Sequence, residues 1–349
     1  MKKLRIAVLF GGCSSEYSVS LQSAHAVLAH LDKTRYAPLP VGITPEGDWL
    51  LYSGGIDALL DDSWRQNAAC CEPCLLSPSR SRRALRTLGR APAEYPVDAV
   101  FPVLHGPNGE DGRVQGLVEL AGIPLVGCGT LASALAMDKH RAHLLAAAAG
   151  VPGPRGRVFG PDALPEQLAA AAGALGWPVF VKPVRAGSSY GVSRVTGPEG
   201  LEAAAALARR YDREIMIEEA VPGFEVGCAV LGREVLTLGL VDEIELAGDF
   251  YDYAEKYTPA GSRIHLPARL SARDTERVLA AGTAVYRALG CSGFARVDLF
   301  FTPEGKILLN EVNTIPGFTA HSRYPNMMKA AGLSFAALLD KLIEQEVQP

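Results

Sequence analysis

The sequence contains no hydrophobic run long enough to cross a membrane. A spanning helix needs about 20 consecutive apolar residues, and the 349-residue chain has no such run. Residues 1–10 carry two lysines before an apolar stretch, as a signal peptide does, but Arg5 interrupts that stretch and Gly11-Gly12 ends it. We interpret this segment as a first β-strand and expect a cytoplasmic protein.

An excess of basic charge is also lacking, and so is a zinc-type cysteine cluster. Lys and Arg number 34 against 38 Asp and Glu, so the net charge is −4, which argues against a protein that coats nucleic acid. Of the seven cysteines, only Cys71 and Cys74 form a C-x-x-C pair, and no second pair or nearby histidine completes a zinc site. We expect reduced thiols in a surface loop there. The 48% share of hydrophobic residues supports a packed core and excludes a disordered chain.

Two common nucleotide-binding signatures are missing. The chain has no Walker A sequence, and its first glycine turn lacks the G-x-G-x-x-G spacing of dinucleotide-binding proteins, which argues against a dinucleotide-dependent oxidoreductase. A different segment could hold phosphate: Lys182 ends an apolar strand, and a Gly/Ser loop with Ser188 and Ser189 follows it. Taken alone, such a hairpin is more often an ordinary turn.

Strand and helix signals alternate through the first third of the chain. Apolar runs at 4–10, 36–43 and 97–104 predict strands of a doubly wound parallel sheet, with a helix over 18–31. After a Gly/Pro break at 150–154, short strands separated by glycine turns predict an α+β arrangement. The expected class is therefore a multidomain α/β and α+β protein. We divide it into domains at 1–129, 130–222 and 223–349.

Three segments carry less regular signals. Residues 53–94 show little periodicity and predict loops and short helices. The Ala-rich stretch 130–149 predicts one helix with Thr130 as its N-cap. The polar, Tyr-rich stretch 246–263 has no clear period and is a candidate mobile loop.

Acidic and amide side chains recur on two apolar runs near the C-terminus. Arg296 and Asp298 alternate with apolar residues, and so do Glu311 and Asn313 after a turn, so each pair lies on one face of a strand. If the two strands pair, Asp298, Glu311 and Asn313 converge. Such oxygen ligands suit Mg²⁺, which takes further ligands from water and phosphate, and two ions would fit with Glu311 between them. The alternative is an exposed face of solvated charge, which the otherwise apolar strands disfavour.

Other polar residues follow predicted strands. Glu16 follows the first strand, and the string HGPNGEDG at 105–112 follows the strand at 97–104. Because the carboxyl ends of parallel strands meet at one sheet edge, Glu16 could hold a substrate ammonium there. Farther along, an apolar link at 219–224 could offer backbone groups to adenine, and Glu225 could bind ribose hydroxyls. Taken alone, each of these segments also fits a surface loop or a strand connection.

Together these motifs resemble the D-alanine–D-alanine ligase family of ATP-grasp enzymes over essentially the whole chain. HGPNGEDG at 105–112 matches the first family signature, and GFARVD at 293–298 with EVNTIPG at 311–317 matches the second. The resemblance implies an ATP-grasp fold behind an N-terminal α/β domain, and ligation of D-alanine to D-alanine or D-serine for peptidoglycan precursors. It also implies ATP as co-substrate, two Mg²⁺ ions with Mn²⁺ as a substitute, and a homodimer without nucleic-acid or membrane partners.

The resemblance also implies roles for single residues. The nucleotide side comprises two phosphate-binding lysines, a loop serine, the adenine link, the ribose-binding acid and a lysine of the closing loop: Lys139, Lys182, Ser189, Glu219, Ala220, Val221, Glu225 and Lys256. The metal ligands are Asp298, Glu311 and Asn313. A helix lysine such as Lys139 would on its own be interpreted as solvated.

On the substrate side, the resemblance implies that Glu16 holds the ammonium of the first D-alanine, linked by hydrogen bonds to Ser188 and Tyr257. His105 would lie near the carboxylate of that substrate. The remaining roles are two oxyanion stabilisers and one contact for the second carboxylate: Arg296, the Gly317 amide and Ser322.

One departure concerns the second substrate. Most housekeeping members have a small or apolar residue after Ser322, whereas this chain has Arg323 in the string HSRYP and keeps EKYT at 255–258. This combination is similar to the vancomycin-resistance D-alanine–D-serine ligases, and a guanidinium could bind a serine hydroxyl. We favour D-serine. The alternatives are a strict D-alanine–D-alanine ligase in which Arg323 only forms salt bridges near the rim, and a non-catalytic nucleotide-binding module, which the intact residue set disfavours.

Overall fold

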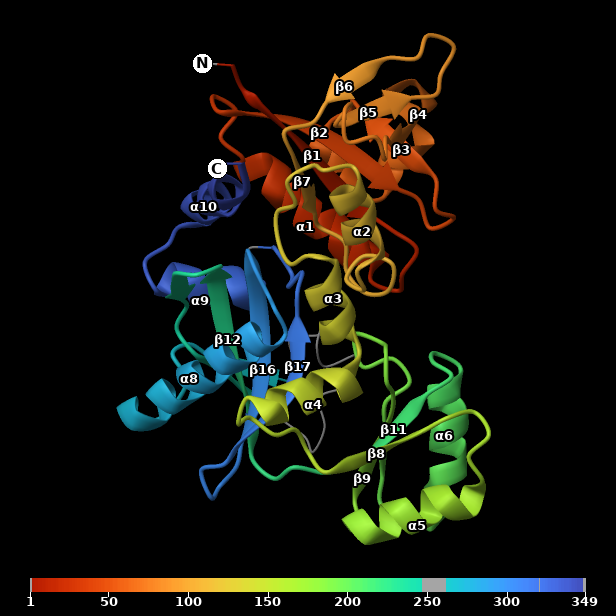
Figure 1. Cartoon of the computed structure of the whole chain (residues 1–349), viewed down its shortest axis with the longest axis vertical. Helices are drawn as coiled ribbons and strands as arrows, with labels where there is room; N and C mark the ends of the chain where they lie inside the picture. The colour runs from red at the N-terminus through yellow and green to blue at the C-terminus, as the bar shows by residue number, and fades with distance from the viewer. Residues whose placement is uncertain (1, 247–261, 320, 348–349) are drawn as a thin grey trace.

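The computed structural model describes residues 2–246, 262–319 and 321–347, which form three β-sheets with helices packed around them (Figure 1). The first sheet has the strand order β6-β5-β4-β3-β2-β1-β7. Its strands are β1 (Leu4–Gly11), β2 (Tyr36–Ile43), β3 (Trp49–Tyr52), β4 (Cys71–Leu76), β5 (Ala84–Thr87), β6 (Glu94–Pro96) and β7 (Ala99–Pro102). The expected α/β multidomain class is confirmed. No described helix is both long and apolar enough to cross a membrane.

The parallel strand pairs of the first sheet lie at the end of the sheet where β7 is the edge strand. β1 lies between β2 and β7 and is parallel to both, and its side chains from Ile6 to Phe10 are fully buried. From β2 to β6 the pairs are antiparallel. Short connections join β2 to β3, β4 to β5 and β5 to β6, whereas residues 53–70 connect β3 to β4. The interpretation of residues 53–94 as loops and short helices is therefore only partly right. The segment contains β4, β5 and the start of β6 besides the 3₁₀ helices η1 (Ile56–Leu59), η2 (Ser63–Gln66) and η3 (Ala68–Cys70).

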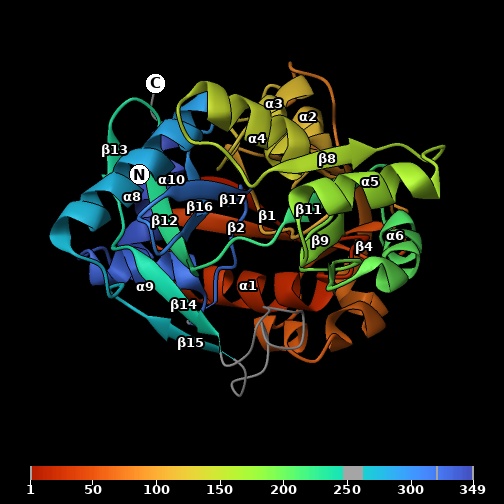
Figure 2. The same cartoon turned by 90° about the horizontal axis from the view of Figure 1, so that it is seen from below.

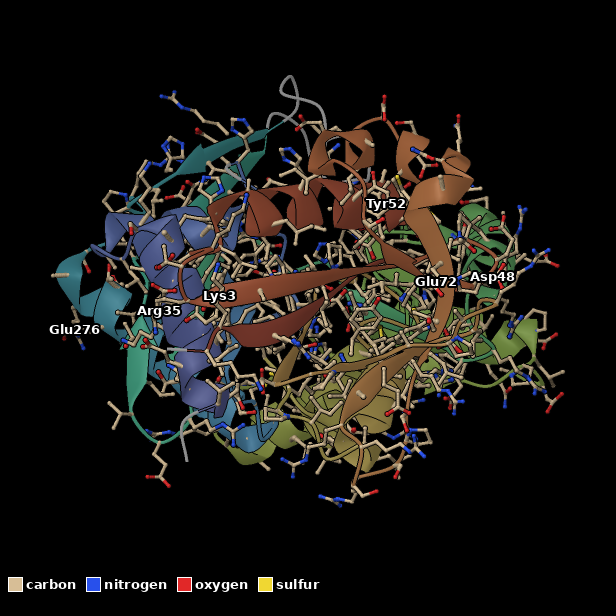
Figure 3. The ribbon with its side chains drawn as sticks, turned by 90° about the horizontal axis from the view of Figure 1, so that it is seen from above. Lys3, Arg35, Asp48, Tyr52, Glu72 and Glu276 are labelled. Carbon is tan, nitrogen blue, oxygen red and sulfur yellow. The ribbon has the colours of Figure 1, made fainter. Side chains whose placement is uncertain are left out.

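Helices from both ends of the chain cover the first sheet. α1 (Tyr17–His30) and α2 (Arg113–Leu120) follow its strands, and the last helix, α10 (Phe335–Val347), returns to it (Figure 1). Leu338 and Leu342 of α10 share a core with β1. Arg35, labelled in Figure 3, pairs with Asp340 at 3.1 Å and with Glu344, so an ion pair also joins the two ends.

The second sheet is a separate four-stranded antiparallel layer in the order β10-β9-β11-β8 (Figure 2). Its elements are β8 (Gly156–Phe159), α5 (Pro165–Leu175), β9 (Val179–Pro183), β10 (Ser193–Val195), η4 (Pro198–Gly200), α6 (Leu201–Arg209) and β11 (Ile215–Glu219). Small side chains such as Ala172 and Ala205 let α5 and α6 pack closely on Val181 and Ile217. The layer therefore has a hydrophobic core of its own.

The third sheet carries the remaining strands in the order β15-β14-β12-β16-β17, with β13 beside β12. These are β12 (Phe224–Gly232), β13 (Leu236–Leu238), β14 (Asp242–Leu246), β15 (Ser262–His265), β16 (Phe294–Phe301) and β17 (Ile307–Asn313). The helices in this part of the fold are α3 (Thr130–Met137), α4 (Lys139–Ala148), α8 (Ala272–Ala288) and α9 (Arg323–Ala330). The rest of the candidate loop 246–263 lies outside the described residues.

The helix predicted over 130–149 is in fact two helices. The backbone at Asp138 is extended (φ −88°, ψ 95°), and its side chain caps α4 by accepting a hydrogen bond from the Arg141 amide at 3.0 Å. The N-cap of α3 is Gly129 rather than Thr130, whose hydroxyl donates to Glu119 at 2.8 Å. The break turns α4 so that Lys139, its first residue, faces the third sheet.

A β-bulge shapes the face of β17. Asp298 of β16 stands opposite Glu311, but the next pair of the register skips Asn310. The extra residue changes the alternation, so Leu309 and Val312 both join the core with α8, whereas Glu311 between them faces the opposite side.

Hydrophobic packing crosses the predicted domain borders. The borders themselves stay a prediction. Ala132 of α3 and Ala142 of α4 belong to the core of the third sheet together with Val226, although we assigned 130–148 to the central domain. Helix α10 likewise packs on both sheets, because Leu338 and Leu342 share one core with β1 and with Ala229 of β12.

Gly293 tests how closely the chain before β16 of the third sheet approaches Gly127, which lies after α2 of the first sheet. Its φ is +70°, and a Cβ there would lie 2.8 Å from the Gly127 Cα. We expect Gly293→Ala to lower the free energy of unfolding by about 3 kcal/mol, from left-handed strain plus the clash between backbones. Gly290→Ala is the control, because φ is +67° there with open space around it, and should cost about 1 kcal/mol. Urea unfolding measures both, and equal losses would contradict the close approach.

Candidate active site

Two connected cavities lie where the three sheets meet. The larger has a volume of about 840 Å³ and is lined from the first sheet by Glu16 and His105, from the second by Ser188, and from the third by Arg296 and Asn313. The smaller, about 470 Å³, lies between the second and third sheets, and Lys139 and Glu311 line both cavities. The molecule therefore offers one long site with two chambers.

Glu16 places a buried carboxylate in the larger cavity. It is the N-cap residue of α1, and its side chain accepts a hydrogen bond from the Ser188 hydroxyl across the boundary between two sheets. Its Oε2 is buried without a hydrogen-bond partner among the described residues. Cβ atoms at Gly106 and Gly187 would lie 2.5 and 2.9 Å from that oxygen, so both glycines are required for the fit. A buried carboxylate oxygen of this kind calls for a cation.

The polar face of β16 and β17 forms one wall of the same cavity. The two strands pair, which was the condition for the expected convergence, and Asn313 Nδ2 donates to Asp298 Oδ2 at 2.8 Å. Arg296 Nε donates to Asp298 at 2.8 Å, and Lys139 Nζ lies 3.3 Å from Glu311 Oε2. The structure thus brings together the three predicted metal ligands and two predicted cationic residues.

The donor chemistry of this wall fits a hard divalent cation. It supplies the Glu311 carboxylate and the Asn313 amide to the cavity, with the Asp298 carboxylate buried behind them. Among the described residues, no group of three His, Cys, Asp or Glu side chains could by itself hold a metal ion. An incomplete set of oxygen ligands is what Mg²⁺ uses when phosphates and water complete its shell.

Arg323 joins three carboxylates beneath the wall. Its Nε and NH2 each donate to Asp242 at 2.8 Å, and its NH1 donates to Glu225 at 2.9 Å and lies 3.2 Å from Asp298. Burial would raise the pKa of Asp242, but the adjacent guanidinium outweighs it and the pKa is lowered. Only 10% of the Arg323 side chain is exposed, so its salt bridges lie inside the protein rather than near the rim.

The smaller cavity contains the residues predicted for the nucleotide. Lys182 Nζ pairs with Glu218 Oε2 at 2.5 Å, and the Glu218 Oε1 is buried without a hydrogen-bond partner among the described residues. Sequence reasoning missed Glu218, although a buried acid that ends an apolar strand was a visible signal. The Glu219 carboxylate pairs with Arg155 at 2.6 Å, so the link offers its backbone rather than this side chain. Ala220, Val221 and Glu225 also line this cavity.

The loop between β9 and β10 covers the junction of the cavities. Ser188 and Ser189 both have left-handed backbones, with φ of 49° and 57°. Two consecutive non-glycine residues in this region store strain, which is common at ligand-binding loops. Ser188 lines the larger cavity and Ser189 the smaller one.

His105 lines the larger cavity, but both ring nitrogens are engaged. Nδ1 lies 2.9 Å from the Ile315 carbonyl oxygen and Nε2 lies 3.0 Å from the Ser23 hydroxyl. Burial lowers the pKa of His105, which favours the neutral ring with its proton on Nδ1. Both imidazole nitrogens are therefore already bonded in this structure, and neither is available to the carboxylate of the first substrate, near which His105 was predicted to lie.

The residues predicted to contact the second substrate follow β17. The Ser322 hydroxyl accepts a hydrogen bond from the Thr319 amide at 2.9 Å, and a Cβ on Gly317 would lie 2.8 Å from it. Ser322, Gly317 and Arg323 all line the larger cavity. The predicted Lys256 and Tyr257 lie outside the described residues.

Asp242 tests how far the site depends on charge compensation. We expect Asp242→Asn to lower the free energy of unfolding by about 3 kcal/mol, because Arg323 loses one partner of a buried ion pair. The surface control Asp57→Asn, which removes an exposed partner of His25, should cost under about 1 kcal/mol. The pKa of Asp242 is lowered in the folded protein. The extra free energy of unfolding of wild type over the variant should therefore be fully present above the unfolded pKa of about 3.9, and it should be lost as the pH falls through the folded pKa. Urea unfolding across pH measures this, and a loss no larger than the control's would contradict it.

Family models and known relatives match most of the chain. The family model described as the N-terminus of D-ala D-ala ligase matches residues 5–128, and the model of the C-terminus matches residues 146–344. The vancomycin/teicoplanin A-type resistance protein VanA of Enterococcus faecium is 44% identical over 351 residues, which cover 98% of each chain. A D-alanine–D-alanine ligase of Caldicellulosiruptor bescii is 42% identical over 354 residues, 100% of this chain and 96% of that one.

A solved structure is also similar. The crystal structure of VanG D-Ala:D-Ser ligase from Enterococcus faecalis matches with a TM-score of 0.92 and 50% identity, over 99% of this chain and 100% of that one. The relatives thus include vancomycin-resistance ligases as well as D-alanine–D-alanine ligases. The chain belongs to the D-alanine–D-alanine ligase family of ATP-grasp enzymes, which form carbon–nitrogen bonds, and it resembles the vancomycin-resistance branch of that family.

Proposed function

We propose that this protein joins D-alanine to a second D-amino acid, preferentially D-serine, through an acyl-phosphate intermediate that forms at the expense of ATP. The product would serve as a peptidoglycan precursor. The observation that carries the proposal is the Glu16 carboxylate, buried beside Ser188 with an unpartnered oxygen in the cavity that also holds Arg296 and the Gly317 turn. A primary ammonium is the group that this oxygen lacks.

Family membership implies ATP and a divalent metal, and we propose two Mg²⁺ ions, with Mn²⁺ as a substitute. Asp298, Glu311 and Asn313 would hold them, and the bound cations would neutralise charge on the transferring phosphoryl group. Lys139 and Lys182 would lie along the phosphates, and the link around Ala220 and Val221 would hold adenine through its backbone.

In the first step, a carboxylate oxygen of D-alanine attacks the γ-phosphorus of ATP. The bond from the γ-phosphorus to the β–γ bridging oxygen breaks, ADP leaves, and an acyl phosphate remains. Glu16 would hold the ammonium of this D-alanine, so that the carboxylate is directed toward the junction of the two cavities. The lysines supply the charge that spreads over the transferring oxygens.

In the second step, the neutral amine of the second amino acid attacks the acyl carbon. A carbon–nitrogen bond forms, and the carbonyl oxygen carries negative charge until the bond from the acyl carbon to the bridging oxygen breaks. Phosphate then leaves, and the nitrogen gives its proton to that phosphate or to solvent. Arg296 and the Gly317 amide would stabilise this oxyanion, and loss of one such donor costs about 3 kcal/mol of barrier.

The preference for D-serine rests on Arg323. A guanidinium has five N–H donors, of which the hydrogen bonds to Asp242 and Glu225 use three. Because these acids fix its orientation beside Ser322, a hydroxyl on the second substrate would meet a rigid donor. The similarity to VanG D-Ala:D-Ser ligase favours the same choice. The strict D-alanine–D-alanine ligase is the second candidate, and the relative from Caldicellulosiruptor bescii favours it.

The non-catalytic nucleotide-binding module is disfavoured, because the predicted acids and cations face one another around the cavities. The homodimer and the cytoplasmic location stay predictions.

The activity can be tested by phosphate release with ATP, Mg²⁺ and D-alanine, with and without D-serine, followed by chromatography of the products. We expect stoichiometric phosphate and dipeptide, with D-Ala–D-Ser in excess when both amino acids are present. D-Ala–D-Ala alone would support the second candidate, and no amino-acid-dependent phosphate would contradict both.

The role of Arg323 can be tested by the product ratio, which does not depend on the amount of folded protein. Arg323→Leu should lower the ratio of D-Ala–D-Ser to D-Ala–D-Ala about tenfold or more, because the hydroxyl loses its donor. Arg35→Leu, which removes a guanidinium paired at the surface with Asp340, should leave the ratio unchanged. An unchanged ratio in Arg323→Leu would assign the selectivity to other residues.

A further inference from the structure

Side chains from the loop after β7 hold the backbone turn that carries Gly317. The Ile315 amide donates to Glu110 Oε1 at 3.2 Å, and the Ile315 carbonyl accepts a hydrogen bond from His105 Nδ1 at 2.9 Å. Both backbone groups of one residue, two positions before Gly317, are thus fixed by side chains more than 200 positions earlier in the chain.

Ser23 of α1 holds the other side of the turn. Its hydroxyl accepts a hydrogen bond from the Phe318 amide at 3.2 Å and lies 3.0 Å from His105 Nε2. With the His105 proton on Nδ1, the Ser23 hydroxyl donates to Nε2, so the two contacts form one continuous chain of hydrogen bonds. The Gly317 amide lies between the two held positions.

The same loop is tied to Glu16. The second oxygen of Glu110 accepts from the Gly106 amide at 2.7 Å. Ser14 donates to the His105 carbonyl at 2.6 Å and accepts from the Glu16 amide at 3.1 Å. Hydrogen bonds therefore run from the backbone of Glu16 to the turn of Gly317.

This connection matters because the two ends belong to different sheets. Glu16 follows β1 of the first sheet, and Gly317 follows β17 of the third. The relative position of the ammonium site and the oxyanion donor depends on noncovalent contacts across that boundary, and a misplacement of about 1 Å at a reacting centre can cost about 100-fold in rate.

We propose that Glu110, supported by His105 and Ser23, is a positioning residue. It holds the Gly317 amide where it donates to the oxyanion that forms when the second amine attacks the acyl carbon. The proposal rests on the ligase function proposed above. Both Glu110 oxygens accept backbone N–H groups, so the residue acts through the turn. The oxyanion exists only in the second step, so weakening this hold slows dipeptide formation and not the preceding transfer of phosphate.

The test is a single-turnover rapid-quench experiment on full-length protein with ATP, Mg²⁺ and D-alanine, following ADP for the first step and dipeptide for the second. Glu110→Gln keeps the size of the side chain but replaces one acceptor oxygen with an NH₂ donor. The glutamine cannot accept hydrogen bonds from both the Gly106 and the Ile315 amide in the same arrangement. We expect ADP formation within about twofold of wild type and dipeptide formation about 10- to 100-fold slower.

Two further variants keep the test decisive. Asp111→Asn is the control, because Asp111 bonds within the same loop, to the Asn108 amide at 2.8 Å, and it should leave both steps near wild type. If Glu110→Gln does not fold, Ser23→Ala takes its place in the test. This variant leaves the Phe318 amide without its acceptor, and it should show the same selective loss of dipeptide formation.

The outcomes separate the two proposals. Equal slowing of ADP and dipeptide formation in Glu110→Gln, or no change in either, would overturn the positioning role while leaving the ligase function intact. Wild-type protein that forms neither ADP nor dipeptide in the presence of D-alanine would instead overturn the proposed function.

Discussion

Compensation of buried carboxylates is the constraint on which the site depends. A buried carboxylate is unfavourable unless a cation or several hydrogen-bond donors meet it. Asp298 meets Arg296 and Arg323, and Glu311 meets Lys139. Glu16 differs, because its described partner is the neutral Ser188 hydroxyl and one of its oxygens has no described partner. Glu16 is thus the residue for which we propose that a substrate ammonium supplies the missing cation.

The compensating groups come from different sheets, so the site and the packing of the sheets are one problem. Lys139 begins a helix that packs on the third sheet, whereas Lys182 belongs to a strand of the second, and both line the smaller cavity. The break at Asp138 directs Lys139 inward, and the bulge at Asn310 directs Glu311 toward it. Local departures from regular structure therefore create the arrangement that the chemistry needs.

Short-range patterns predicted much of this fold, and long-range contacts could not be predicted. The apolar run at 36–43 became a strand with those same bounds. Asp298, Glu311 and Asn313 converge because β16 and β17 do pair, which was the condition for that expectation. The bulge at Asn310 could not be predicted, because no particular residue type marks the point where side chains change the face of the strand on which they lie. The partners of Arg323 lie 81 and 98 positions away, and those of Ile315 more than 200, distances over which periodicity carries no information. The roles of the site residues stay predictions.

The central claim is that a carboxylate oxygen of D-alanine becomes bonded to phosphorus before the dipeptide forms. Labelling both carboxylate oxygens of D-alanine with ¹⁸O, and measuring the released phosphate by mass spectrometry, tests this most directly. Attack of the amine breaks the bond between the acyl carbon and the bridging oxygen, so the account predicts one ¹⁸O atom in each phosphate released with dipeptide. Dipeptide formation with unlabelled phosphate would contradict an acyl-phosphate intermediate and the arrangement of the site derived from it.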